Sequence, residues 1–424
     1  MSGDRGRWSA YTVWLVYSGT WSFIASLSWT TTAVYLVRDV HMSPFELVLA
    51  GTAMELAYFI FEVPTGVLAD VRSRRLSMIV GAGVMGTAML VSGLVASAPV
   101  VLAAMALWGI GWTFRSGAED AWLADEIGSA RLGSAYQRSA QLDRVTGLLG
   151  IGAAVGLSLV DLSWPLIAAG ICAFGLAAFL HLAMPEDGFT RPTARAHGGS
   201  LRTALATVSS GRRVVAAHPV LVLVLAIAFL FGMWAEGFDR LKEAHFLLEV
   251  GLPELFSLES VVWFGVLRAG TMILSFAVAA PLVASVEALG QAKLVRLLIA
   301  FHLLLIVAAL SFALVGEVWP AIAAYWFTTV VRELIEAPYR TWLNTAITDS
   351  SVRATVLSIA SVSGSAGEWG GGPVLGWVAT RWTIRTSLAA GALMLAPALL
   401  LLGRAAAHQG RDPDLTDVES TAVR

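Results

Sequence analysis

Ionisable residues stand within apolar stretches at two places where their spacing could do chemistry. Arg115 precedes Glu119 by four residues, and Arg332 precedes Glu336 by the same interval. In a helix, such residues share one face and can form a salt bridge. A charge at the centre of a bilayer costs at least about 2.5 kcal/mol, so these groups should face a cavity or a partner rather than lipid. A glutamate freed from its arginine could accept a proton, which points to ion-coupled transport.

Aromatic residues share these helix faces and suggest what a cavity there would bind. Flat apolar solutes bind well against aromatic rings beside a few polar groups. The alternative is that the aromatic stripes only pack and that each charged pair only neutralises itself. We expect the substrate cavity to include Trp21, Trp108, Trp112, Arg115, Glu119, Tyr325, Arg332, Glu336 and Tyr339.

Two more glutamates lie in apolar stretches without an Arg or Lys within four residues. They are Glu55 and Glu368. Burial without a nearby cation favours the neutral carboxyl, which suits a proton carrier. Small residues around Glu368 would equally fit close helix packing. The candidates for proton coupling are therefore Glu55, Glu119, Glu336 and Glu368.

The elements that carry these residues must be membrane helices. The chain has 424 residues, of which 57% are hydrophobic and 14% charged, whereas soluble domains are roughly 45–50% apolar and 25% charged. A helix needs around 20 mostly apolar residues to cross the bilayer. The pattern predicts an all-α polytopic membrane protein with twelve transmembrane helices, near 11–37, 45–69, 76–97, 99–124, 138–160, 164–184, 219–248, 257–284, 292–315, 318–344, 354–380 and 384–403.

The distribution of basic residues predicts orientation and domain organisation. Most Arg and Lys fall in loops on one side, which places both termini in the cytoplasm and the chain in the inner (plasma) membrane. A connection rich in Pro, Gly, Ser, Thr and Arg separates the first six helices from the last six. We expect a six-helix bundle over 1–184, a cytoplasmic linker over 185–218, a second bundle over 219–403 and a cytoplasmic tail over 404–424.

Several function classes lack the residues that they need. There is no G-x-x-x-x-G-K-[ST] motif for ATP, no zinc-ligand spacing and no G-x-S-x-G elbow. We therefore expect no enzyme activity, no cofactor and no metal. The net charge of −2, with scattered basic residues, argues against nucleic-acid binding. The lone Cys172 reads as a buried, inert thiol. Expected partners are the lipid bilayer, a small-molecule substrate and a proton gradient, with the chain acting as a monomer.

One loop carries a family resemblance. The segment Gly66-Val-Leu-Ala-Asp70-Val-Arg72-Ser-Arg74-Arg75 resembles the loop signature G-x-L-a-D-[RK]-x-G-R-[RK] of the major facilitator superfamily, with departures at positions 71 and 73. Shorter fragments at 116–125, 236–240 and 353–358 resemble its drug-efflux branch, although the fifth helix lacks the Gly-Pro of the antiporter signature. The resemblance implies two pseudo-symmetric bundles that rock around a cavity lined by helices 1, 4, 7 and 10. It also implies a gate loop made of Gly66, Asp70, Arg72, Arg74 and Arg75, with Asp125.

These observations together predict a secondary active transporter that exports small amphipathic molecules in exchange for protons by alternating access. An importer or symporter of a small organic solute is the first alternative. Sugar uptake would favour more Asn and Gln along the cavity helices than the sequence holds. A non-transporting membrane sensor is the second alternative, but such a protein would have little need for repeated charges at mid-depth.

Overall fold

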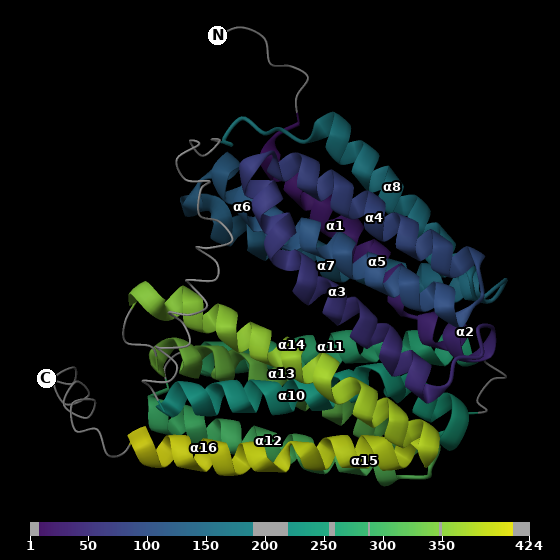
Figure 1. Cartoon of the computed structure of the whole chain (residues 1–424), viewed down its shortest axis with the longest axis vertical. Helices are drawn as coiled ribbons and strands as arrows, with labels where there is room; N and C mark the ends of the chain where they lie inside the picture. The colour runs from purple at the N-terminus through teal and green to yellow at the C-terminus, as the bar shows by residue number, and fades with distance from the viewer. Residues whose placement is uncertain (1–7, 190–218, 254–258, 287–288, 347–349, 410–424) are drawn as a thin grey trace, which may run out of the picture. The chain divides into compact units, whose positions relative to one another are not determined.

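The computed structural model describes residues 8–189, 219–253, 259–286, 289–346 and 350–409, and all regular secondary structure within them is helical. The described residues form two compact units (Figure 1). The first contains those of 1–200, 242–247 and 252–269, and the second those of 201–241, 248–251 and 270–424. The linker expected over 185–218 falls mostly outside the described residues, so its boundaries stay a prediction.

Helices α1 to α8 belong to the first unit. Their bounds are α1 Ala10–Trp29, α2 Thr32–Arg38, α3 Pro44–Val71, α4 Arg74–Leu94, α5 Ala98–Ser116, α6 Ala118–Ile127, α7 Ser129–Ser158 and α8 Trp164–Ala183. The remaining helices are α10 Pro219–His245, continued by a π-helical turn over Phe246–Val250, α11 Ser260–Val286, α12 Gln291–Leu314, α13 Val318–Ala346, α14 Ser350–Arg381, α15 Ile384–Met394 and α16 Ala396–Gln409. The compact units divide α11, whose first ten residues group with the first unit.

Hydroxyl side chains fix where several helices begin. Ser43 and Glu46 form a capping box at the start of α3, with Pro44 as the first helical residue. Ser73 caps α4 by accepting a 2.9 Å hydrogen bond from the backbone N–H of Leu76. Ser43 therefore fixes the start of α3 and Ser73 the start of α4, and the family-like segment 66–75 runs from the end of α3 through Arg72 and Ser73 into the first turn of α4.

Three of the expected spans are interrupted. The span 11–37 is divided into α1 and α2, 99–124 into α5 and α6 at Gly117, and 384–403 into α15 and α16. At the first break, the Thr30 hydroxyl donates to the carbonyl of Ser26 at 2.5 Å, and that of Thr32 donates to Ser28. Such back-bonding competes with the regular helical ladder and bends helices.

Judged by length and composition, eight helices in the described part of the chain are long and apolar enough to cross a membrane. The expected spans that do not qualify have visible reasons. Spans 138–160, 318–344 and 354–380 lie in helices with charged residues, whereas α1 contains Trp, Tyr and Ser in place of aliphatic residues. The prediction of an all-α polytopic membrane protein with twelve spans is confirmed, because a helix or helix pair occupies each expected range.

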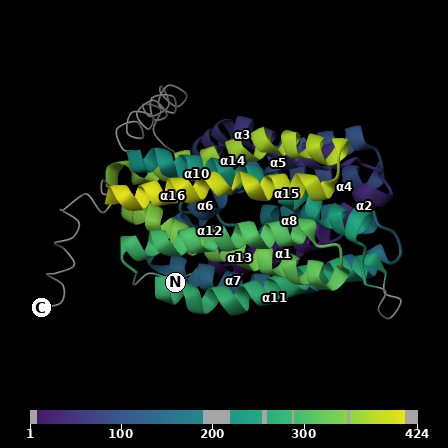
Figure 2. The same cartoon turned by 90° about the horizontal axis from the view of Figure 1, so that it is seen from below.

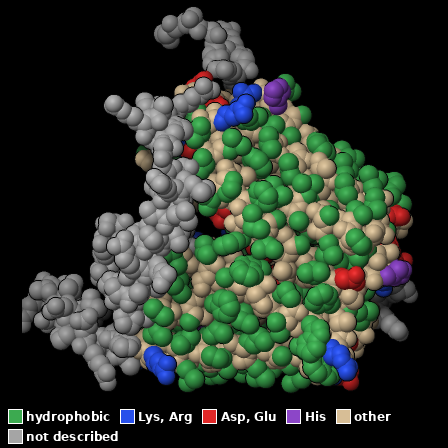
Figure 3. Space-filling model, in the orientation of Figure 1, with side chains coloured by type: hydrophobic (Ala, Val, Ile, Leu, Met, Phe, Trp, Pro, Cys, Tyr) green, Lys and Arg blue, Asp and Glu red, His purple; other side chains and the backbone are tan. Residues whose placement is uncertain are grey.

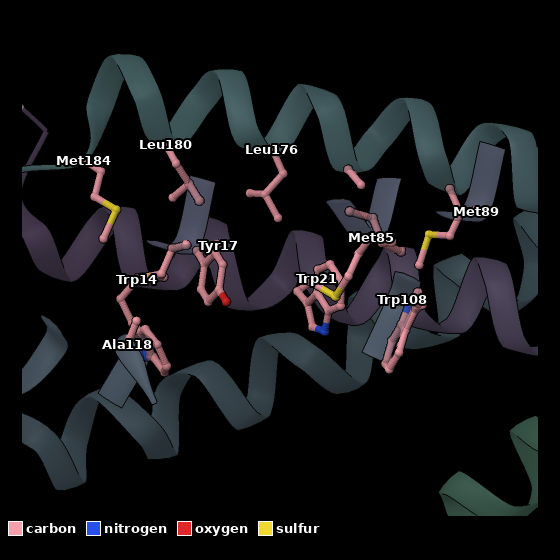
Figure 4. Packing of buried hydrophobic residues seen from close by; sticks show 14 of the residues in the cluster. Trp14, Tyr17, Trp21, Met85, Met89, Trp108, Ala118, Leu176, Leu180 and Met184 are labelled. Atoms are coloured by element: carbon pink, nitrogen blue, oxygen red, sulfur yellow. The ribbon is translucent and has the colours of Figure 1, made fainter. Parts of the chain in front are cut away.

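A seam of small residues holds α4 against α8 in the first unit. A Cβ atom added to Gly170 would lie 2.6 Å from Cγ of Leu90 and 2.8 Å from the carbonyl oxygen of Gly86. Only glycine lets these backbones approach so closely, as at other membrane helix interfaces. Beside the seam, side chains of α1, α4, α5 and α8 form a buried core, shown in Figure 4 with Trp14, Tyr17, Trp21, Met85, Met89, Trp108, Leu176 and Leu180.

In the second unit, α12 packs against α13, α15 and α16, and α14 packs against α15. Figure 2 shows the pair α15 and α16 running along α12. Hydrophobic side chains are spread over the face in Figure 3 and few charged ones interrupt them, as expected for a surface that meets lipid. Exposed examples are Phe59, Ile60, Ile171, Ile273 and Phe276.

Candidate transport site

The first charged pair is present and lies in the first unit. Arg115, near the end of α5, donates from Nε to the Glu119 carboxylate of α6 at 2.7 Å. The Tyr17 hydroxyl of α1 lies between them, accepting from Arg115 Nε at 2.7 Å and donating to Glu119 Oε2 at 2.6 Å. The predicted pairing of Arg115 with Glu119 is therefore confirmed. Three helices from two spans, α1 and the pair α5 and α6, meet in one largely buried hydrogen-bonded cluster.

Aromatic rings surround the Arg115 guanidinium. Its Cζ atom lies 4.5 Å from the ring centroid of Trp21 and 4.7 Å from that of Trp112. Trp112 in turn stacks on Trp108 with ring centroids 5.4 Å apart. Nη1 of Arg115 is buried without a hydrogen-bond partner among the described residues. The guanidinium is thus stabilised on its faces by cation–π contacts, while one of its donors is left unused.

The second predicted pair is wrong. Arg332 of α13 instead donates from Nη1 to both carboxylate oxygens of Asp239 on α10, each at 2.8 Å. Glu336 pairs with Arg340, one turn further along α13. Glu336 has an arginine four residues before it and another four residues after it. A glutamate N-terminal to its cation is the better orientation on a helix, and Asp239 offers Arg332 a two-oxygen acceptor.

The two arginines nevertheless have matching surroundings. Arg115 on the fourth span packs on Tyr17 and Trp21 from the first span of its unit. On the tenth span, Arg332 packs over Phe231 and Trp234 from the seventh, at 5.9 and 5.6 Å from their centroids. Each arginine therefore packs on aromatic rings of the equivalent helix, although the carboxylate comes from its own span for Arg115 and from the partner span for Arg332.

Two members of these clusters are not among the residues expected to line the cavity. Tyr17 stands one turn before Trp21, and helical spacing places it on the same aromatic face of α1. Asp239 stands in the charged run from Glu236 to Arg240, whose expected position is the outer mouth of the seventh helix. No signal in the sequence shows that it reaches Arg332, because that contact joins residues 93 positions apart.

The two tyrosines predicted for the cavity lie in different surroundings. Tyr325 is a buried core residue that packs against Phe312 with ring centroids 6.0 Å apart. The Tyr339 hydroxyl is 3.4 Å from the carbonyl oxygen of Val224 on α10. Tyr339 also lines a cavity of the second unit together with Glu336 and Glu368, so the fold brings three predicted site residues to one place.

Glu55 and Glu368, the two candidates with no Arg or Lys within four residues in the sequence, are both half-buried. Glu55 lies on α3, one turn before Tyr58, whose hydroxyl donates to Glu62 at 2.8 Å. Glu368 lies on α14, close enough to act electrostatically on Arg332. A cation therefore influences Glu368 from another helix, which its own sequence neighbourhood does not show.

The family-like loop is tied to neighbouring segments of the first unit. Arg74 pairs with Asp125 at the end of α6 and, at 3.6 Å, with Asp70. It also donates to the backbone carbonyl of Ala121 at 2.8 Å. These contacts join the loop to the fourth span, as proposed for Asp125, and all of them lie within one unit.

The rest of the loop is held by backbone contacts and by Glu186. Arg75 donates from its backbone N–H to Glu186 at 2.9 Å and from its side chain to the carbonyl of His181. Of the other residues predicted for the gate, Gly66 has open space around its Cα atom and Arg72 is exposed at the end of α3. The firm anchors of this loop are therefore Arg74 and Arg75.

Comparisons with known proteins agree with this architecture. Residues 14–368 match the family model described as Major Facilitator Superfamily. No curated protein matches the chain in sequence.

Solved transporter structures share the fold. A point mutant of the nucleoside transporter NupG aligns with a TM-score of 0.77 and 11% identity, covering 94% of this chain and all of its own. A bacterial homologue of the human lysosomal transporter Spinster gives 0.66 and 15%, covering 94% and 95%. A peptide transporter of the POT family gives 0.71 and 13%, covering 98% and 97%. The chain is a transporter rather than an enzyme, and it belongs to the major facilitator superfamily.

Proposed function

We propose that this protein is a proton-coupled secondary transporter that exports small amphipathic molecules by alternating access. It would reside in the inner (plasma) membrane with both termini in the cytoplasm. The observation that carries the proposal is the cluster of Arg115, Glu119 and Tyr17 against the faces of Trp21 and Trp112.

The cluster suggests how substrate and proton could exchange. In this structure the Glu119 carboxylate is occupied by hydrogen bonds from Arg115 and Tyr17. A flat solute that stacks on Trp21 and Trp112 competes with the guanidinium for the same ring faces. Displacing Arg115 frees the Glu119 carboxylate to take up a proton. Binding of substrate and binding of a proton would then be linked through one arginine.

A second candidate function is symport of a small organic solute with protons. The observation in its favour is the buried Nη1 of Arg115, which lacks a hydrogen-bond partner among the described residues. Burying an unused charged donor is costly, and a carboxylate or phosphate oxygen of a solute would satisfy it. Relatives in fold include a nucleoside transporter and a peptide transporter, which fits this candidate as well.

Purified protein in liposomes under an imposed pH gradient distinguishes the two candidates. The probes are ethidium and Hoechst 33342 for export, and radiolabelled uridine and dialanine for symport. An antiporter accumulates its substrate when the vesicle lumen is acidic, whereas a symporter does so when the outside is acidic. Failure of every probe to respond to either gradient contradicts proton-coupled transport.

Variants test whether the cluster is responsible. Glu119→Gln should abolish accumulation driven by the gradient. Asp120→Asn is the matched control, because Asp120 is an exposed carboxylate on the same helix, and within the described residues its one hydrogen-bond partner is Tyr136, at 2.8 Å. Equal accumulation by the wild type and Glu119→Gln, at equal protein per vesicle, contradicts the role of Glu119.

A further inference from the structure

A cavity lies within the second unit, between the helices α10, α12, α13 and α14. Its volume is about 120 Å³, close to the roughly 150 Å³ that holds a benzene molecule in an apolar protein interior. Aliphatic side chains, glycines and the ring of Phe231 form most of its wall, and the His302 ring meets the Phe231 ring edge-on with centroids 6.5 Å apart. The cavity therefore has the size and the lining to hold a small molecule of low polarity.

One side chain of the wall presents a hydrogen-bond acceptor. His302 is 1% exposed, and its Nδ1 lies 2.8 Å from the carbonyl oxygen of Leu298, one turn earlier on α12. A carbonyl oxygen only accepts, so Nδ1 carries the hydrogen, and in the neutral ring Nε2 keeps a lone pair. Burial in an apolar wall favours this neutral ring over an imidazolium. Within the part of the chain that the structure describes, no donor reaches Nε2, so a buried acceptor on the cavity wall is left without a partner.

The two carboxylates of the wall already lie under the influence of arginines. Glu336 pairs with Arg340, and Arg332 acts electrostatically on Glu368. Their negative charges are therefore not left for a ligand to balance, and the cavity does not call for a cation. What the wall lacks is a donor for the neutral imidazole, which an uncharged hydroxyl group can supply.

We propose that this cavity is a binding site for a small uncharged molecule of low polarity that carries one hydroxyl group, such as a phenol, and that the hydroxyl donates to Nε2 of His302. An aromatic ring in the cavity gains an edge-to-face contact with Phe231. The hydroxyl satisfies the buried acceptor, whereas a methyl group in the same place leaves it unpaired. The ring of His302 stays neutral, and no covalent bond changes. The site is independent of proton coupling, and it gives the second unit a recognition point for an uncharged donor.

Nitrogen NMR of the purified full-length protein, titrated with phenol, tests the hydrogen bond. The signals of His302 are those lost in His302→Gln, and the exposed His41 reports any change that phenol causes in the medium. The neutral ring should carry hydrogen on Nδ1, and the Nε2 signal should move upfield as phenol donates to it. Toluene, with a methyl group in place of the hydroxyl, should leave that signal in place. It should also bind about two- to tenfold more weakly than phenol, as measured by the toluene concentration that reverses the phenol shift.

A cavity-filling variant keeps His302 but removes the space. Gly364 lines the cavity, and the nearest atom that an added Cβ meets is the carbonyl oxygen of Ala228, at 3.9 Å, so the side chain of Gly364→Leu can occupy the cavity. This variant should lose the response of Nε2 to phenol. Gly370→Leu is the matched control, because Gly370 lies on the same helix, is exposed, has open space for a Cβ atom and is not a lining residue. It should respond as the wild type does.

Several results overturn the proposal. A neutral ring with hydrogen on Nε2 removes the acceptor. An Nε2 signal that phenol does not move means that the cavity holds water only or no ligand. A shift with toluene equal to that with phenol rules out the hydrogen bond, and an equal phenol response in Gly364→Leu and the wild type places phenol elsewhere. If Gly364→Leu does not fold, the comparison of phenol with toluene in the wild type decides alone. None of these measurements needs a gradient, so failure of proton-coupled transport leaves their outcome unchanged.

Discussion

Neutralising the three carboxylates that pair with Arg115, Arg332 and Arg340 should destabilise the protein to very different degrees. Burial ranks them, because an ion that loses its partner away from water costs more. The side chains of Arg115 and Glu119 are 13% and 16% exposed, those of Arg332 and Asp239 28% and 35%, and those of Arg340 and Glu336 74% and 58%.

These exposures give the expected magnitudes. Glu119→Gln strands a buried arginine and should cost about 3–5 kcal/mol. Asp239→Asn removes two charge-assisted hydrogen bonds in a partly hydrated site, and should cost about 1–3 kcal/mol. Glu336→Gln removes an exposed pair, and should cost about 0–1 kcal/mol. At about 1.4 kcal/mol for each tenfold change, the first variant should unfold at least a hundredfold more readily.

Reversible unfolding in mixed detergent micelles, followed by circular dichroism, measures these differences. Charge-swapped proteins provide the control. Asp239→Arg combined with Arg332→Asp should recover most of the stability lost in Asp239→Asn. The same exchange between Arg332 and Glu336 should not, because those residues are not partners in the fold. A cost for Glu336→Gln equal to that for Glu119→Gln would refute the ranking, and rescue by the Arg332 and Glu336 exchange would refute the assignment of partners.

Three further predictions concern the gate loop, the helix seam and acid stability. Asp125→Asn should lower transport several-fold at unchanged membrane abundance, and Asp70→Asn should lower it less. The reason is that Asp70 is largely exposed and lies 3.6 Å from Arg74, further than Asp125 does. Flux per molecule in vesicles measures the difference. Gly170→Val should destabilise the first unit by about 1–3 kcal/mol or more through overpacking against α4, and unfolding in micelles should show no comparable loss for Gly175→Val, whose added Cβ atom meets open space. Hydrogen bonds from the side chain and the backbone N–H of Ser163 lower the pKa of Asp161 in the folded protein. The stabilisation that they give is therefore present above the ordinary Asp pKa of about 3.9 and is lost as the pH falls through the lower pKa of the folded state. The difference in melting temperature between the wild type and Ser163→Ala should shrink below about pH 4.

The spans were predictable because the bilayer imposes one strong demand on length and polarity. Each expected range holds a helix or a helix pair, and the limits of α3 and α4 agree with the Ser43 and Ser73 caps. The breaks inside three spans were not predicted, because hydropathy averages over a window and does not register hydroxyls that bond back to the helix. Charges also make α7, α13 and α14 less hydrophobic than a typical span, yet they still form long helices.

The candidate site was predictable where partners lie on one helix or on adjoining ones. Arg115 and Glu119 stand four residues apart, and helical spacing alone pairs them. The same rule fails for Arg332. Glu336 has an arginine four residues away on either side, and helical spacing cannot show that Asp239 approaches Arg332 from α10.

The glycine seam between α4 and α8 has a mechanical consequence. Where Gly86 and Gly170 bring two backbones into contact, there is no side chain between them to rotate and absorb a displacement. Close-packed interiors have low compressibility and transmit strain. The two helices should therefore move as one rigid body, so that a displacement at the Arg115 cluster shifts the whole pair instead of bending it. A bulkier residue in the seam would force the two backbones apart and place a rotatable side chain between them, so part of each displacement would be absorbed there.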